Sequence, residues 1–138
     1  MLVREWMTAP PILVAPRTSA HAALRLMEQR KIRRLPVEDE SGLVGIVTKS
    51  DIQSKLGPFP LSWRRLNLRV TDVMTREPFS VGPDDSLSRV AGLMLAHKIS
   101  GVPVVEGGKT VGIVTESDVF RAFSEALGIL EGGGTRAA

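Results

Sequence analysis

Hydrophobic positions in the first half of the chain change periodicity in a fixed order, beginning with an extended run and a helix. The apolar run ILV at 12–14 predicts a short strand that a proline closes. Ser19 then stands where a helix N-cap is expected, because its hydroxyl can accept a hydrogen bond from a free amide of the first turn. Ala23 and Met27 follow at helical spacing. The pattern predicts a helix over about 19–30.

The next stretch has the pattern of a β-hairpin followed by a second helix. Two apolar runs, RLPV at 34–37 and LVGIVT at 43–48, flank a turn that contains Gly42. A helix is expected to begin near Ser50, directly after the second run. The first half of the chain is therefore predicted to fold as a β-α-β-β-α unit.

The same order returns when the chain is shifted by 67 residues, without a gap up to the last helix. The shift aligns Ser19 with Ser86, and it aligns VGIVTKSD at 44–51 with VGIVTESD at 111–118. One copy of about 55 residues would bury little surface alone, so two copies should pack together. We expect an α/β (α+β) fold of two β-α-β-β-α domains about a pseudo-twofold axis. The expected division is 1–56 for the first domain, 57–69 for a linker, 70–130 for the second domain and 131–138 for a disordered tail.

Composition argues against several classes of function. The 138 residues include no cysteine and two histidines, so we expect no disulfide framework, no thiolate nucleophile and no metal site. No nucleophile with an adjacent base can be assembled, and we expect no catalytic residues and no enzyme activity. No apolar run approaches the roughly 20 residues that cross a bilayer, and the N-terminus lacks a secretory signal pattern. The expected location is the cytoplasm, away from membranes.

The charge distribution is asymmetric although the net charge is only +3. Residues 1–69 contain 12 Lys/Arg and 6 Asp/Glu, whereas the rest contains 6 and 9. The basic residues concentrate in RKIRR at 30–34 and WRRLNLR at 63–69. Such clusters can meet nucleic acid, a membrane surface or a phosphorylated small molecule, or they can be a solvated helix end and linker.

The repeated string places a threonine at the end of a strand and an aspartate three residues later, at the start of a helix. Asp51 and Asp118 could act as caps that accept backbone amides, worth about 0.5 to 2 kcal/mol. A carboxylate can also accept both hydroxyls of a ribose, while Thr48 and Thr115 suit a sugar or a phosphate. The residues alone leave both interpretations open.

The order MT…P…V.P..S……LM….I…PV…..VGIVT.SD, present twice, resembles the CBS domain, which is named after cystathionine β-synthase. The resemblance covers about residues 3–125, and a tandem pair of such domains is called a Bateman module. It implies that the two copies pack their sheets together and leave two related clefts. Many members bind AMP, ADP, ATP or S-adenosylmethionine there as regulatory ligands, without a required cofactor. Members commonly dimerise through their helices, which implies a homodimer here.

The family's ribose-binding pattern, Gly-hydrophobic-hydrophobic-Thr/Ser-x-x-Asp, falls once in each copy. The resemblance implies that Asp51 and Asp118 hold ribose hydroxyls and that Thr48 and Thr115 bond sugar or phosphate. The residues expected around the preferred cleft are Thr48, Asp51, Arg33, Arg34, Met74, Phe79, Ile99 and Ser100. The residues expected around the second cleft are Thr115, Asp118, Met7, Ile12, Ile32 and Arg33.

The two clefts are not expected to be equal. Nucleotide-binding members often carry a basic residue just before the first hairpin strand, and here Arg33 and Arg34 align with Ser100 and Gly101. A guanidinium can make bidentate, charge-assisted hydrogen bonds with a phosphate. The cleft with Thr48 is therefore the expected nucleotide site, and the second cleft is expected to lack a matching cation.

The expected function is that of a regulatory module that senses an adenosine-containing nucleotide, with a client protein that the sequence does not identify. One alternative is nucleic-acid binding through the basic first half, which the acidic second half and the scarcity of aromatic residues disfavour. Another is a protein-interaction module without a ligand, in which the threonines and aspartates only cap helices. Titration with nucleotides and a DNA duplex separates the three.

Overall fold

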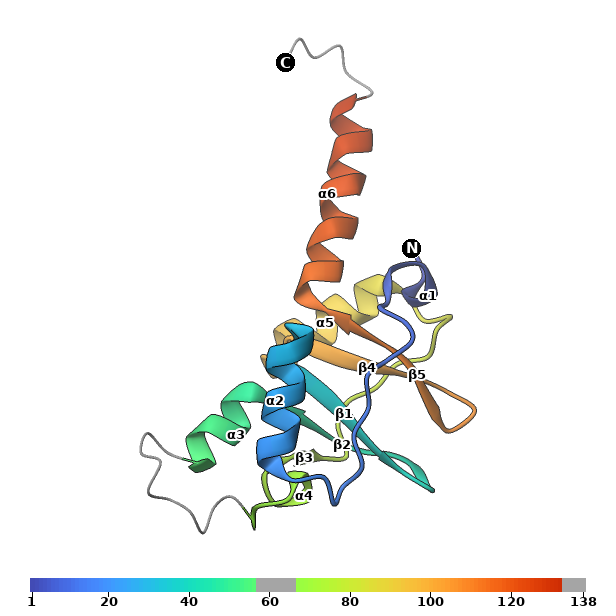
Figure 1. Ribbon diagram of the computed structural model, residues 1–138. Helices are drawn as coiled ribbons and strands as arrows, with labels where there is room; N and C mark the ends of the chain where they lie inside the picture. Colours follow the sequence, from blue (N-terminus) through green and yellow to red (C-terminus); the bar gives the residue numbers. More distant parts are fainter. Residues whose placement is uncertain (57–66, 133–138) are drawn as a thin grey trace.

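The computed structural model describes residues 1–56 and 67–132, and Figure 1 shows how their helices and strands are arranged. Most of the predicted linker and of the predicted tail lies outside the described residues. The elements of the first half are α1 (Val3–Trp6), α2 (Ala20–Arg30), β1 (Arg34–Asp39), β2 (Gly42–Thr48) and α3 (Lys49–Leu56). Those of the second half are α4 (Val70–Val73), β3 (Thr75–Arg76), α5 (Leu87–His97), β4 (Gly101–Glu106), β5 (Lys109–Thr115) and α6 (Glu116–Gly132).

The two halves repeat each other at the spacing that the sequence predicts, except that the counterpart of β3 in the first half is an isolated bridge between Thr8 and Ile113. Both helices α2 and α5 begin after a serine cap: Ser19 Oγ accepts from the Ala22 amide at 3.0 Å, and Ser86 Oγ accepts from the Arg89 amide at 3.2 Å. The hairpins β1–β2 and β4–β5 are antiparallel and share a register shift at the same relative position. The predicted first strands are reduced to single parallel bridges, at Val14 and at Val81.

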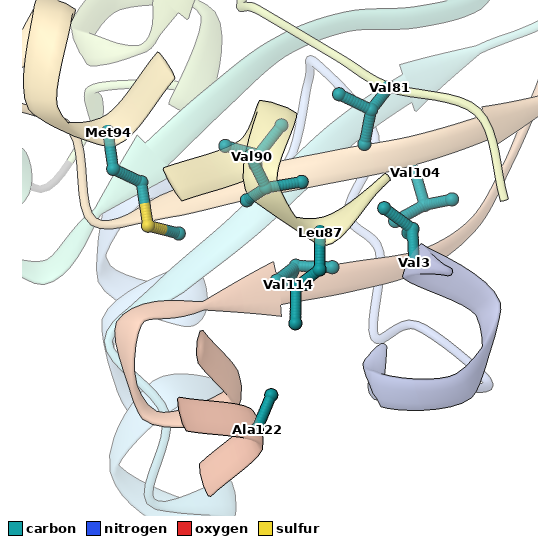
Figure 2. Packing of buried hydrophobic residues seen from close by; sticks show 9 residues of the cluster. Val3, Val81, Leu87, Val90, Met94, Val104, Val114 and Ala122 are labelled. Atoms are coloured by element: carbon teal, nitrogen blue, oxygen red, sulfur yellow. The ribbon is translucent and has the colours of Figure 1, made fainter. Parts of the chain in front are cut away.

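Each hydrophobic core contains a segment from the other half of the chain. Val3 of α1 is fully buried with Leu87, Val114 and other side chains of the second half, and Figure 2 shows it among them. Val70 of α4 is likewise buried in the core of the first half. The strand β3 adds to the edge of β2, opposite Gly45 and Ile46. The two halves are therefore held together by exchanged apolar side chains as well as by contacts between their sheets.

The last helices differ in length, although they begin at equivalent positions. The described helix α3 has 8 residues and ends at Leu56, before Gly57 and Pro58 in the sequence, two residue types that disfavour helix continuation. Helix α6 has 17 residues and extends away from the rest of the fold (Figure 1). Among the described helices, none has the length and apolar character needed to cross a membrane.

Candidate functional site

Two clefts lie where the ends of the repeated hairpins meet the other half of the chain. The first, which we call the Thr48/Asp51 cleft, has a volume of about 420 Å³. The second, which we call the Thr115 cleft, has a volume of about 380 Å³. Both volumes fall in the range of small-molecule sites. The clefts are thus large enough for a nucleoside, and their linings decide what each can hold.

The strand end at the Thr48/Asp51 cleft is fixed by a reciprocal pair of hydrogen bonds. The Asp51 amide donates to Thr48 Oγ1 at 3.0 Å, and the Thr48 amide donates to Asp51 Oδ2 at 3.0 Å. The capping interpretation of the repeated string is therefore confirmed for this copy. The half-buried Asp51 side chain lines the cleft, and its Oδ1 accepts no hydrogen bond from the described residues. Capping leaves one carboxylate oxygen available for a ligand.

The equivalent aspartate of the second copy is in a different environment. Asp118 is 3% exposed, and its Oδ2 accepts from the Thr115 amide at 2.8 Å and from Thr115 Oγ1 at 3.3 Å. Its Oδ1 pairs with Arg121, whose guanidinium lies 5.9 Å from the ring centroid of Trp6. Both carboxylate oxygens are occupied, and Asp118 does not line the Thr115 cleft. Ser54 aligns with Arg121, so the first copy has no such ion pair.

Arg34 lies between the two clefts and lines both of them. Its Nη1 donates to Ser100 Oγ at 2.7 Å. Burial lowers the pKa of the Arg34 guanidinium from its ordinary value, and this outweighs the opposing effect of the nearby Glu116 charge. Among the described residues, no carboxylate forms an ion pair with Arg34. A partly desolvated cation without an anionic partner favours the binding of an anion next to it.

The structure brings together most of the residues that the sequence predicts for the first cleft. Those that line it are Thr48, Asp51, Arg34, Phe79, Ile99 and Ser100. Met74 does not line it, because its side chain packs beneath Gly45 and against the core of the first half. Arg33 lines the Thr115 cleft instead.

The second cleft contains four of the six predicted residues. Thr115, Ile12, Ile32 and Arg33 line it. Met7 packs beneath Gly112 and against the core of the second half, in the same way as Met74 does in the first, and the ion pair with Arg121 holds Asp118 away from the lining.

Several lining residues were not predicted from the sequence. His97 lines the Thr48/Asp51 cleft and stacks on Phe79, with ring centroids 3.9 Å apart and planes inclined by 20°. The same cleft contains Glu77 and Lys98, and the Thr115 cleft contains Lys31 and Ser117. The residues of the first copy that align with Phe79 and His97 are Ile12 and Arg30. A comparison of the two copies could therefore have identified the aromatic pair from the sequence.

The charges of the two linings differ from the sequence expectation. The Thr115 cleft contains three cations, Lys31, Arg33 and Arg34, and no lining carboxylate. In the Thr48/Asp51 cleft, two cations, Arg34 and Lys98, are balanced by two carboxylates, Asp51 and Glu77. The expectation that the second cleft lacks a matching cation is wrong, because residues 31–34 run along that cleft. Asp51 gives the first cleft its sugar acceptor, whereas the second has the stronger positive charge.

The protein consists of two repeated units, each with a β-hairpin followed by a helix, and a cleft large enough for a small ligand lies at the end of each hairpin. It therefore belongs to the class of tandem-repeat proteins with paired clefts. The family model for the CBS domain matches residues 3–57 and residues 70–125. The chain therefore belongs to the CBS-domain family and carries two copies of the domain. In the described residues, no group of three or more His, Asp or Glu side chains is arranged to hold a metal ion.

Solved structures and curated relatives agree with this membership. The crystal structure of CBSX2 from Arabidopsis thaliana in complex with AMP is 33% identical, with a TM-score of 0.77 over 91% of this chain and 97% of that one. The CBS domain pair of protein MJ0100, in complex with 5′-methylthioadenosine and S-adenosyl-L-methionine, is 34% identical, with a TM-score of 0.79 over 91% and 98%. Inosine-5′-monophosphate dehydrogenase of Korarchaeum cryptofilum is 38% identical over 110 residues, which cover 79% of this chain and 21% of the enzyme. The chain thus spans about a fifth of that relative.

Proposed function

We propose that this protein is a regulatory module that binds an adenosine-containing nucleotide in the Thr48/Asp51 cleft. The observation that carries the proposal is the half-buried Asp51 side chain, which lines a cleft of about 420 Å³ and whose Oδ1 accepts no hydrogen bond from the described residues. A ribose supplies two adjacent hydroxyl donors, which suit such an acceptor. Hydrogen bonds from the ribose hydroxyls to the charged Asp51 carboxylate would be stronger than hydrogen bonds between neutral groups.

The other lining residues suit the remaining parts of an adenosine ligand. Phe79 is 47% exposed and stacks on His97, so it offers an aromatic surface to a purine next to Ile99. Arg34 lines the cleft and is suited to a phosphate. The balanced charge of the lining tolerates both AMP and the sulfonium cation of S-adenosylmethionine. Complexes of related CBS pairs with AMP and with S-adenosyl-L-methionine support this ligand class.

The role is one of binding rather than catalysis. The polar groups that face the cleft are suited to hold sugar hydroxyls and phosphate. The enzyme relatives are several times longer than this chain, which covers 21% and 23% of the first two. Ligand binding at a boundary that both halves form is suited to regulation, because it links the relative position of the halves to occupancy.

The same protein is proposed to act as a homodimer that assembles through the helices of its second half. Leu95 is 83% exposed and Phe120 is 66% exposed, and both lie beside a groove between α5 and α6. Their aligned residues in the first half are Glu28 and Gln53, so the helix pair α2 and α3 lacks these two apolar side chains. Exposed apolar patches of this kind are typical of interaction surfaces, and a twofold axis lets the same patch serve both partners.

Light scattering tests the dimer with a variant in which Leu95 and Phe120 are replaced by the polar residue types found at the aligned positions of the first half. The parent is expected at twice the chain mass of 14.9 kDa at micromolar concentration, and the double variant Leu95→Glu, Phe120→Gln at the chain mass. The matched control Gln53→Ala, on the first half, should leave the parent mass unchanged. A parent of monomer mass, or a double variant that stays dimeric, contradicts the proposed surface.

Calorimetric titration tests the ligand site with AMP, adenosine, S-adenosylmethionine and a short DNA duplex. The Asp51→Ala variant is expected to bind AMP about ten- to a hundredfold more weakly, the value of a hydrogen bond to a charged group. Asp85→Ala is the matched control, because Asp85 Oδ2 also accepts a backbone amide, from Gly82 at 2.7 Å, and lies outside both clefts. Equal affinities of the two variants for AMP, or binding of DNA but of no nucleotide, would refute the proposal.

A further inference from the structure

Arg34 is placed to interact with ligands in both clefts. It is the only residue that lines both the Thr48/Asp51 cleft and the Thr115 cleft, among the linings that the described residues form. As the first residue of β1 it pairs with Thr48, the last residue of β2. Its guanidinium is held by the hydrogen bond to Ser100 Oγ, a single neutral partner that lines the Thr48/Asp51 cleft. A side chain held by one such bond can turn toward an anion on either side.

The pseudo-twofold axis does not supply a second arginine. The residue aligned with Arg34 is Gly101, and the Arg34 side chain occupies the space beside it. A Cβ at Gly101 would lie 2.4 Å from Arg34 Cδ and 2.6 Å from Nη1, so glycine is required for this path of the side chain. The first half thus provides one central cation, and the second half provides the room for it.

We propose that Arg34 couples the two clefts, so that an anionic ligand in one weakens the binding of an anionic ligand in the other. The inference rests on the proposed function for the identity of the first ligand. A phosphate in the Thr48/Asp51 cleft holds the guanidinium on that side, where Ser100 also lies, whereas a turn toward the Thr115 cleft breaks the bond with Ser100. The Thr115 cleft then keeps Lys31 and Arg33 but loses its third cation. Linkage makes the effect reciprocal, because each ligand changes the other's affinity by the same factor.

The coupling has a specific dependence on ligand charge. Adenosine has no phosphate, so it can occupy the first cleft through Asp51 without moving Arg34. AMP competes for Arg34, and the expected effect on an anion in the Thr115 cleft is about tenfold, the low end of the range for a charge-assisted hydrogen bond. Repulsion between the two anions adds a smaller effect, which salt screens. The regulated quantity is then the balance of two anions rather than the occupancy of one cleft.

Nuclear magnetic resonance titration can follow both clefts of the full chain at once. Backbone amide signals of Thr48 and Asp51 report the first cleft, and those of Thr115 and Ser117 report the second. Inorganic pyrophosphate is the probe for the cationic Thr115 cleft. It is titrated into protein saturated with adenosine and into protein saturated with AMP. We expect pyrophosphate to bind about tenfold more weakly in the AMP-saturated protein.

Two arginine variants identify the residue that is responsible. In Arg34→Ala the ratio between the AMP and adenosine conditions should fall to about twofold or less, because only repulsion remains. Arg33→Ala is the matched control, since Arg33 lines the Thr115 cleft alone. It should weaken pyrophosphate in both conditions and keep the ratio near tenfold.

The outcomes separate this inference from the proposed function. If AMP shifts the Thr48 and Asp51 signals but leaves pyrophosphate affinity unchanged, the coupling is refuted and the nucleotide site stands. If the ratio persists in Arg34→Ala, another group carries the coupling and the inference is wrong. If AMP does not shift those signals, the proposed function fails and the coupling of nucleotides fails with it. If pyrophosphate does not shift Thr115 and Ser117, the second cleft is not an anion site and the coupling is likewise refuted.

Discussion

Replacement of Asp118 by alanine should destabilise the protein more than the same replacement of Asp51. Each aspartate accepts a hydrogen bond from the amide of the threonine three residues earlier, at 2.8 Å for Asp118 and 3.0 Å for Asp51. Loss of such a cap costs about 1 kcal/mol. Asp118 also pairs with Arg121, whose side chain is 63% exposed, so the value of a surface ion pair applies and adds up to about 1 kcal/mol. The expected losses of unfolding free energy are about 2 kcal/mol for Asp118→Ala and about 1 kcal/mol for Asp51→Ala.

Urea unfolding of both variants measures these losses, and a thermal scan offers a second readout. At about 3 °C per kcal/mol for a chain of this size, the midpoint should fall by about 6 °C for Asp118→Ala and by about 3 °C for Asp51→Ala. Arg121→Ala closes the comparison, because in its background the two aspartate replacements should cost nearly the same. The interpretation of Asp118 as a structural residue would be refuted if both aspartate replacements cost the same unfolding free energy in the parent background. It would also be refuted if the difference between their costs persisted in the Arg121→Ala background.

Two further substitutions test the fold and the central cation. Gly101→Ala should cost less than about 1 kcal/mol of stability, because the new Cβ would meet the far end of the flexible Arg34 side chain. In calorimetry it should weaken the binding of AMP more than the binding of adenosine. Equal effects on the two ligands would contradict the placement of Arg34. Val3→Ala should lower the free energy of unfolding by about 2 kcal/mol in urea, because this fully buried side chain of α1 completes the core of the second half. A loss below about 0.5 kcal/mol, which is typical of a surface substitution, would show that the exchanged segment contributes little to stability.

The repeat in the sequence predicted the local structure well. Helices α2 and α5, their serine caps and the two hairpins follow from short-range patterns that each copy contains in full. The partner of α1 could not be predicted in this way. Val3 is an apolar residue of a four-residue helix, and nothing in its neighbourhood indicates that it packs in the second core. Such choices depend on tertiary packing, which local patterns do not encode.

The candidate site was predicted in its residues more than in its geometry. Thr48 and Asp51 were found because the repeated string fixes their spacing, and Arg34 because it has no counterpart in the second copy. The two arginines were nevertheless placed together, although Arg33 precedes the strand that begins at Arg34 and lines the other cleft only. Side chains of consecutive residues near a strand point to opposite sides, and this alternation could have separated them. The pairing of Asp118 with Arg121 required a comparison with Ser54 that the shared motif obscured.

The nucleotide site is tested most directly by a crystal structure of the protein grown with AMP and by a parallel crystal grown with S-adenosylmethionine. A nucleoside is expected in the Thr48/Asp51 cleft in at least one of the two crystals, with its ribose hydroxyls on Asp51 Oδ1 and its base against Phe79 and Ile99. In the AMP complex the phosphate should lie beside Arg34. A nucleoside bound without contact to Asp51, or a Thr48/Asp51 cleft that is empty at saturating concentrations of both ligands, would contradict the proposed site.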